Sequence, residues 1–203
     1  METFQLSEKL LKKIANLILA KKNTPLKKIV KDIHFADMAE IINELNEDQG
    51  VYLIKLFDSE KTSEILTELD EDVREKILKV LSVKEIADEI EELDSDDAAD
   101  ILGELSEKRK EEVISEISDN DLADDLKELL SYKEDSAGGL MAKELVQANE
   151  NWSVTKCLKE IKKQGENVTR VHSIYVVDDK QKLIGRLSLK DLITSPAKNL
   201  IKD

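Results

Sequence analysis

The sequence predicts a mainly α fold: a superhelical array of short α-helices, followed by a small and incomplete α/β module. Three observations support this prediction. Charged residues make up 37% of the 203 residues and aromatic residues only 3%, a composition typical of helical proteins rich in solvent-exposed surface. Apolar residues recur every twelve positions from residue 45 to residue 129. After residue 131 the repeat stops, and helix-like and strand-like runs alternate.

The repeat consists of single apolar anchors, most of them preceded by another apolar residue or pair three or four positions earlier. Ile65 and Leu66, for example, precede Leu69. This spacing places one apolar stripe on a helix of about ten residues. Because so short a helix is not stable alone in water, the stripes must share one core, as in a solenoid. The anchors are Leu45, Phe57, Leu69, Leu81, Leu93, Leu105, Ile117 and Leu129.

A residue suited to capping a helix N-terminus follows each of the first seven anchors. The side-chain oxygen of such a residue accepts a hydrogen bond from an open backbone N–H group of the next helix. Ser82 and Glu85 also have the spacing of a capping box. We therefore expect helices to begin within one or two residues of Asn46, Asp58, Asp70, Ser82, Asp94, Ser106 and Ser118.

Charge is distributed unevenly along the chain. Residues 136–203 contain 12 Lys+Arg and 8 Asp+Glu, whereas residues 1–135 contain 19 and 37. An excess of 18 negative charges argues against nucleic acid as a partner of the first part and suits cations or basic partners. The change of sign predicts a domain boundary near residue 135.

Several function classes are disfavoured by the sequence. Cys157 is the only cysteine, so neither an internal disulfide nor a cysteine metal cluster is expected. No apolar run approaches the ~18–20 residues needed to span a bilayer, so we expect no membrane insertion and a cytoplasmic location. The two histidines lie in unrelated contexts and no catalytic arrangement is visible, so an enzyme is not expected.

The stretch DSDDAADIL (94–102) concentrates acidic residues on one short predicted helix. Asp96 and Asp97 fall in the first turn, where the helix dipole favours negative charge by ~0.3–1 kcal/mol. Asp100 lies beyond that turn. Asp96 and Asp100 are i, i+4 neighbours that repel by a few tenths of a kcal/mol unless a cation lies between them. They are either a solvated helix face or part of a cation site.

The last third of the chain predicts a small α/β module. Gly138 and Gly139 interrupt the helical pattern. A helix over 151–164 with Ser153 as its cap, strands over 173–177 and 183–188, and a short closing helix at LKDLI follow.

Two of these segments resemble a known family. YKEDSAGGLM (132–141) resembles the junction signature of the MgtE family of magnesium transporters and channels, and IYVVDDKQKLIGRLSLKDLI resembles the first of its two cystathionine-β-synthase-type (CBS) motifs. The short-helix array with LDSDDAADIL is similar to the family's N domain. The resemblance implies an acidic N domain over 1–131, a junction over 132–142 and a first CBS motif over 143–203, with the second motif missing.

The resemblance implies a regulatory function. In the family, Mg²⁺ bound weakly and at several positions between acidic domain faces keeps a membrane pore shut, and the pore opens when Mg²⁺ falls. The implied partners are the transmembrane pore domain of the same transporter and a second copy in a homodimer, at the cytosolic face of the membrane. The alternative is a stand-alone helical-repeat scaffold for protein interactions with no role in transport.

The resemblance also implies site residues. The family's N-domain metal ligands match Glu64, Asp96 and Asp100, and the backbone carbonyl of Gly139 is a further candidate.

The CBS pattern Gly-x-x-Ser-x-x-Asp is present as Gly185, Ser188 and Asp191, and the matching Ser and Asp contact the ribose in adenosine-binding CBS modules. Ser188 could equally cap the short closing helix. Ser173 stands where an aromatic that stacks on adenine is common, so we expect at best weak binding of ATP or adenosine.

Overall fold

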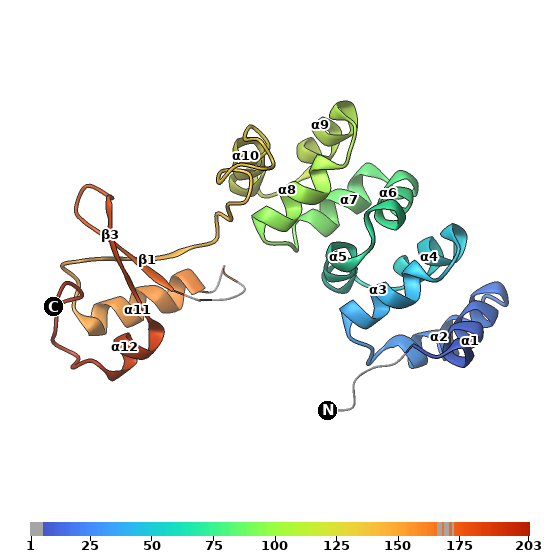
Figure 1. Ribbon diagram of the computed structural model, residues 1–203, viewed down its shortest axis with the longest axis horizontal. Helices are drawn as coiled ribbons and strands as arrows, with labels where there is room; N and C mark the ends of the chain where they lie inside the picture. Colours follow the sequence, from blue (N-terminus) through green and yellow to red (C-terminus); the bar gives the residue numbers. More distant parts are fainter. Residues whose placement is uncertain (1–5, 166–167, 169–170, 172) are drawn as a thin grey trace. The chain divides into compact units, whose positions relative to one another are not determined.

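The computed structural model describes residues 6–165, 168, 171 and 173–203. The chain divides into two compact units, Met1–Gly139 and Leu140–Asp203 (Figure 1). The first unit is helical and the second combines helices with a small sheet, so the predicted fold class is confirmed.

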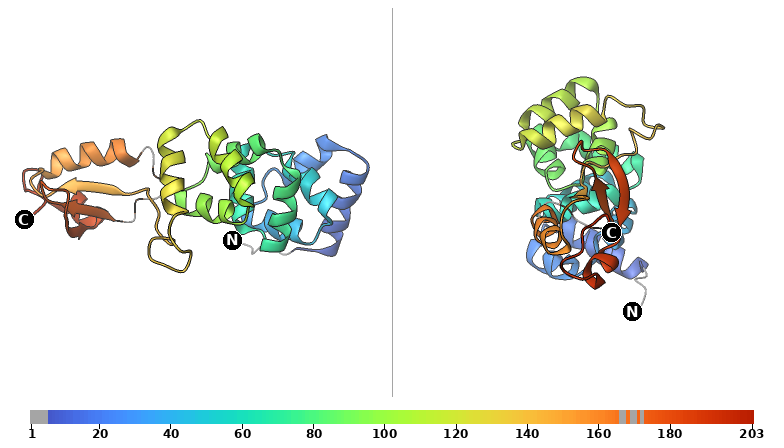
Figure 2. Two further views of the ribbon diagram at one scale, coloured as in Figure 1. Left: turned by 90° about the horizontal axis from the view of Figure 1, so that it is seen from above. Right: turned by 90° about the vertical axis from the view of Figure 1, so that its left-hand side faces the viewer.

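The described part of the first unit is an array of short helices, none longer than 12 residues. Successive helices stack in sequence order, from α1 at the blue end of the unit to α10 at its yellow end (Figure 2). They are α1 (Glu8–Leu19), α2 (Asn23–Val30), α3 (Phe35–Asn43), α4 (Glu47–Ile54), α5 (Ser59–Glu68), α6 (Glu71–Val80), α7 (Val83–Ile90), α8 (Ser95–Gly103), α9 (Glu107–Glu116) and α10 (Asn120–Leu129).

Six of the seven predicted N-cap positions are confirmed, from Asn46 to Ser106. The predicted bond from a backbone N–H group to the cap side chain is present at three of them: Asn46, Asp58 and Ser82. The predicted capping box of Ser82 and Glu85 is present. The seventh cap is Asp119 rather than Ser118. The Asp119 carboxylate accepts from two backbone N–H groups at 2.9 and 3.2 Å, while the Ser118 hydroxyl donates to Glu91 at 2.7 Å.

The core of the array comes from contacts between helices two positions apart. Helix α3 packs on α5, α5 on α7 and α7 on α9, while α4 packs on α6 and α8 on α10. The apolar pairs that precede the anchors are the most deeply buried residues, with Ile65 and Leu66 at most 1% exposed. Leu45, Phe57, Leu93 and Leu105 are only half-buried, because each anchor follows the last helical residue and lies in a turn at the rim of the core.

Basic side chains inside the acidic array bind the carbonyl ends of other helices. Lys61 Nζ lies 3.2 Å from the carbonyl oxygen of Val30, the last residue of α2. Arg74 Nη1 lies 3.1 Å from the Leu66 carbonyl oxygen in α5. Arg109 Nη2 makes the equivalent bond to the Leu78 carbonyl oxygen in α6. Since helix C-termini carry partial negative charge, a cation at each of these ends stabilises the array.

The second unit is built on a sheet with strand order β1-β2-β3 in the described residues: β1 (Val146–Asn149), β2 (Ile174–Val177) and β3 (Leu183–Leu187). Helices α11 (Val154–Gln164) and α12 (Leu189–Thr194) complete the unit. Strand β1 pairs parallel with β2, and β2 pairs antiparallel with β3. The sequence prediction missed β1, a strand of only four residues.

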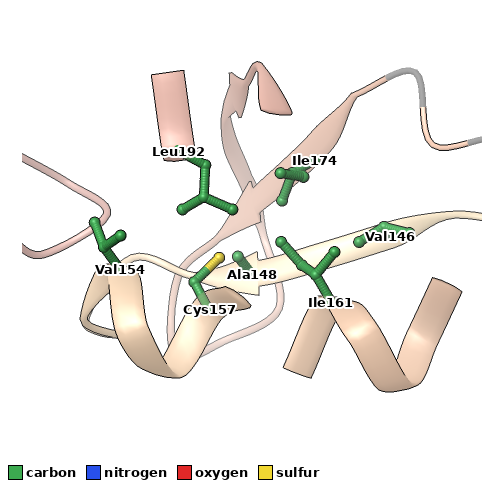
Figure 3. Packing of buried hydrophobic residues seen from close by; sticks show 7 residues of the cluster. All are labelled: Val146, Ala148, Val154, Cys157, Ile161, Ile174 and Leu192. Carbon is green, nitrogen blue, oxygen red and sulfur yellow. The ribbon is translucent and has the colours of Figure 1, made fainter. Parts of the chain in front are cut away.

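Figure 3 shows the core of this unit, where seven buried side chains converge between α11, α12 and the sheet. The predicted cap Ser153 is confirmed at the start of α11. Cys157 is fully buried in this core, and burial raises the pKa of its thiol to about 11. The cysteine therefore packs as a small apolar residue.

Candidate functional site

The acidic stretch 94–102 folds as helix α8, with the backbone carbonyl of Asp94 accepting the first helical hydrogen bond, from Ala98 at 3.0 Å. Asp96 lies in the first turn and Asp100 one turn later. The buried side of α8 is formed by Ala98, Ala99, Ile101 and Leu102, so this helix packs through small and aliphatic residues while its carboxylates remain at the surface.

Asp100 lines a cavity of about 440 Å³ within the first unit. Gly139, the second residue of the junction's glycine pair, lines the same cavity, so the structure brings two of the predicted site residues together. Arg74, Glu104 and Lys110 also line it, from α6, the end of α8 and α9. The cavity is therefore lined by acidic residues and Gly139 together with two basic residues.

Arg74 and Glu104 form the most buried ion pair among those described, with side chains 15% and 16% exposed. The guanidinium donates through Nε and Nη2 to Glu104 Oε1 and through Nη1 to carbonyls at the end of α5. Glu104 Oε2 is buried and has no hydrogen-bond partner in the described part of the chain. One buried oxygen of a carboxylate that lines the cavity is thus left without a hydrogen-bond donor among the described residues.

The electrostatics of Asp100 reflect this surrounding. Desolvation raises the pKa of the Asp100 carboxyl above its usual value, and the neighbouring Asp96 carboxylate raises it further, while the Arg74 guanidinium opposes both effects. Desolvation, followed by the charges of Asp96, Asp94 and Asp100, also raises the pKa of Asp97. The carboxylates of α8 therefore repel one another, and an added cation would relieve this repulsion.

The junction explains why two consecutive glycines stand beside the cavity. A Cβ on Gly138 would lie 2.6 Å from the Tyr132 ring. A Cβ on Gly139 would lie 2.9 Å from the Glu134 Cα and collide with the Lys133 carbonyl oxygen. Only residues without side chains allow the chain to fold back this closely on 132–134.

Glu64, the third predicted carboxylate, is exposed on α5 and is not among the residues that line the cavity. Among the residues that the structure describes, no three His, Cys, Asp or Glu side chains come close enough together to hold a metal ion.

In the second unit, Ser188 is the N-cap of α12. Its Oγ accepts from the Asp191 backbone N–H at 3.0 Å and donates to the Asp191 carboxylate at 2.7 Å. The structure therefore supports the capping interpretation of Ser188. Both side chains are exposed, so a ribose would have to compete with this local hydrogen bond.

The sequence interpretation missed Glu89. This half-buried glutamate lines a second cavity, of about 200 Å³, together with Asp58, Glu85 and Asp88. Its Oε2 is buried and lacks a hydrogen-bond partner among the described residues. Desolvation, followed by the charges of nearby acidic residues, raises its pKa to about 8. The signal was present in the repeat: Glu89 stands twelve residues after Ile77 and twelve before Ile101, at an apolar position.

No helix among the described residues is both long and apolar enough to cross a membrane. Residues 33–135 match the family model of the MgtE intracellular N domain, and residues 137–198 match the CBS domain model.

Two relatives are magnesium transporters MgtE. The one from Thermus thermophilus is 38% identical over 72 residues, and the one from Enterococcus faecalis is 34% identical over 74 residues. Each match spans 36% of this chain but only 16% of the relative.

Two solved structures share the fold. The soluble part of a magnesium transporter superposes with a TM-score of 0.77 at 23% identity, covering 96% of this chain and 77% of that one. The cytosolic domain of the Mg²⁺ channel MgtE in complex with ATP gives a TM-score of 0.85 at 26% identity, covering 95% and 78%.

Proposed function

The chain belongs to the MgtE family, and from this membership we propose that it is the Mg²⁺-sensing cytosolic region of an MgtE-type magnesium transporter or channel. In this proposal, residues 1–131 form the acidic N domain, 132–142 the junction and 143–203 the first CBS motif. The region acts at the cytosolic face of the membrane and catalyses no reaction. Its partners are the pore domain of the same transporter and a second copy of the chain.

The observation that carries the proposal is the cavity beside Asp100. Mg²⁺ prefers oxygen ligands and is usually held by one or two carboxylates with several retained waters. Asp100, Glu104 and Gly139 lie around one space and carry oxygen donors of this kind, and Glu104 Oε2 has no hydrogen-bond partner in the described part of the chain. Asp96, one turn away on α8, adds a second carboxylate to the same helix.

The proposed site binds Mg²⁺ weakly and is shared with a second acidic face. Because few carboxylates of this chain take part, a second acidic face supplies the remaining ligands, and millimolar affinity is expected. Glu64 contributes to another ion of the same kind on α5. Since more than one ion binds weakly, the region responds to the Mg²⁺ concentration of the cytosol.

In this proposal, the pore is gated through the negative charge of the domain faces. Bound Mg²⁺ screens the repulsion between acidic faces and holds the domains together, which keeps the pore shut. When Mg²⁺ falls, the faces repel and separate, and the pore opens. Nucleotide adds little to this response in our proposal, because Ser188 and Asp191 already bond to each other and bind ATP or adenosine at best weakly.

The test is small-angle scattering during a Mg²⁺ titration, on this chain and on a longer form that includes a second CBS motif. Replacing both Asp96 and Asp100 by Asn should remove a clear part of the Mg²⁺-dependent compaction of the longer form. A matched control replaces Glu40 and Glu44 by Gln, an exposed i, i+4 acidic pair on and just after α3. The control should compact as the wild type does.

Equal compaction in the Asn variant and in the wild type would remove the α8 carboxylates from the proposed site. If Mg²⁺ has no effect on any form, the interaction-scaffold function replaces the sensor.

A further inference from the structure

The first two helices have a charge opposite to that of the array they begin. Residues 8–31 contain eight lysines and one acidic residue, Glu8, whereas residues 32–135 contain 11 Lys+Arg and 35 Asp+Glu. These helices precede residue 33, where the match to the family's N domain begins. A basic segment thus covers one end of a strongly acidic helical array (Figure 1).

Three of the lysines form one face of α1. Lys9, Lys12 and Lys13 are spaced i, i+3, i+4 and lie on the side opposite Ile14 and Ile18, which are buried where α1 packs on α2 and α4. All eight lysines of the segment are exposed. Among the described residues, the one ion pair formed by this set joins Lys12 to Glu8, with side chains 74% and 89% exposed.

The lysine face borders a shallow groove of about 720 Å³ with apolar side chains in it. Lys9, Lys12, Lys13 and Lys22 line this groove together with Leu17 and Ala20. Leu19, at the end of the same helix, is 72% exposed. We name the groove and its four lysines the basic groove.

We propose that the basic groove docks the end of the array onto an anionic phospholipid surface. Lysines next to exposed leucine are the combination found where proteins bind the headgroup region of a membrane without crossing it. Lysine ammonium groups are point charges suited to diffuse attraction by headgroups, and clusters of lysine or arginine are typical of segments that bind anionic lipid. The membrane itself comes from the proposed function, which assigns the chain to a membrane transporter.

The acidic array does not oppose this docking at a distance. Charges in solution at physiological salt are screened beyond about 8 Å, so the lysines that touch the headgroups outweigh carboxylates several helices away. A second copy of the chain is the competing occupant, because its array is strongly acidic. Contact between the basic end of one copy and the acidic side of another would join two different surfaces, either reciprocally in a two-fold dimer or head to tail in a ring or open chain.

The experiment is co-sedimentation of the full chain with vesicles at physiological salt in the presence of EDTA. Chelation removes any divalent cation that could bridge carboxylates to phosphate, so the result does not depend on the proposed Mg²⁺ site. Vesicles of equal parts phosphatidylcholine and phosphatidylglycerol should bind the chain, and vesicles of phosphatidylcholine alone should not. Added salt should release it.

The test variant replaces all four lysines of the basic groove by Gln. It should lower the partition coefficient at least about tenfold, because each lysine near an anionic surface contributes roughly a fivefold gain. The matched control removes the same charge from exposed lysines on α6, α9 and α10, and should bind as the wild type does. Its substitutions are K76Q, K79Q, K108Q and K127Q.

An equal loss in both variants, or no binding by the wild type, would overturn the proposal. Sedimentation velocity without vesicles tests the competing occupant. Self-association of the wild type that is lost in the test variant alone would assign the basic groove to a second copy and overturn the docking on lipid. Circular dichroism of both variants checks that α1 remains folded.

Discussion

Two cavities in the acidic array are each lined by a glutamate with one carboxylate oxygen that lacks a hydrogen-bond partner among the described residues. The two glutamates, Glu104 and Glu89, differ in whether a basic side chain pairs with them. At the cavity beside Asp100, Arg74 reaches Glu104 from thirty residues earlier in the chain and forms an ion pair with it. At the second cavity, the nearby cation is Lys55. Its Nζ lies 2.9 Å from Glu85 Oε1, so Lys55 pairs with Glu85 and not with Glu89. The Lys55 hydrogen bond, with bonds from Ser82, lowers the pKa of Glu85 to about 2.

Lys55 thus leaves Glu89 Oε2 without a partner in the described part of the chain, and desolvation, followed by the charges of nearby acidic residues, raises the pKa of Glu89 to about 8. Glu104 is paired with a guanidinium, whereas the raised pKa of Glu89 favours its protonated form. The comparison shows that in a strongly acidic array the few basic residues determine which carboxylates remain charged. The predictions below test each side of this comparison.

The largest loss of stability is expected from a substitution of Arg74. Arg74→Met removes the partner of a buried carboxylate and the donor to three carbonyls at the end of α5. Leaving a buried charge and several polar groups unpaired should lower the free energy of unfolding by about 3–5 kcal/mol. Urea denaturation measures this loss.

Lys79→Met is the control, since Lys79 pairs with Glu75 at an exposed position on the same helix. Its loss should be no more than about 0.5 kcal/mol. Similar losses of stability for the two variants would show that Arg74 does not stabilise the buried Glu104 carboxylate.

The second effect concerns pH. Folding raises the pKa of Glu89 from 4.5 to about 8, so the folded state holds a proton that the unfolded state has lost between these values. The stability of the protein should therefore fall as pH rises through this window. Glu89→Gln mimics the protonated form and should exceed the wild type by roughly 2 kcal/mol at pH 8, after allowance for solvent screening.

The same comparison near pH 3.5, about one unit below the unfolded pKa of 4.5, provides the control, because both states of the wild type then bind the proton and the difference should almost vanish. Denaturant unfolding at both pH values measures it. A gain that does not depend on pH would indicate improved packing rather than a protonated Glu89.

The fold of the array could be predicted because its information is local. Each anchor, its preceding apolar pair and its cap lie within about ten residues, and these decide where the helices begin. Helix α10 begins within two residues of Ser118, as expected, but its cap is Asp119, because Glu91 from a distant turn accepts the hydrogen bond of the Ser118 hydroxyl. Strand β1 was missed because four residues carry little periodicity and are stabilised by pairing with β2, which follows a whole helix later.

The site was less predictable because its contacts join residues that are far apart in the sequence. Residues 32–135 contain 35 acidic residues, and sequence spacing alone does not show which of them are near a cation. The Arg74–Glu104 pair and the Lys55–Glu85 pair each join residues thirty positions apart. Only Glu89 had a local signal, as the acidic member of an apolar repeat position.

A third and smaller effect is expected in the second unit. Ser188→Ala removes the side-chain cap of α12 and should lower the stability of this unit by about 1 kcal/mol. Ser195→Ala, at the other end of the helix, is the control and should have little effect. Hydrogen exchange of the amides in residues 183–194 measures the change. Unchanged exchange in Ser188→Ala, together with loss of adenosine binding, would support the ribose contact instead of the cap.

The smallest expected change in stability tests whether Arg74 fully offsets the repulsion between Asp96 and Asp100. The pKa of Asp100 is raised despite Arg74, so repulsion with Asp96 remains in the folded protein. Replacing both residues by Asn, without Mg²⁺, should therefore raise the free energy of unfolding by a few tenths of a kcal/mol at neutral pH. Because folding raises this pKa, the gain should shrink as pH falls and disappear below the ordinary value of 3.8, where the unfolded carboxyl is protonated too. Differential scanning calorimetry in EDTA at several pH values measures this gain. If the Asn variant is instead less stable at neutral pH, the α8 carboxylates are stabilised by the helix dipole and by Arg74, and the array needs no cation at this position.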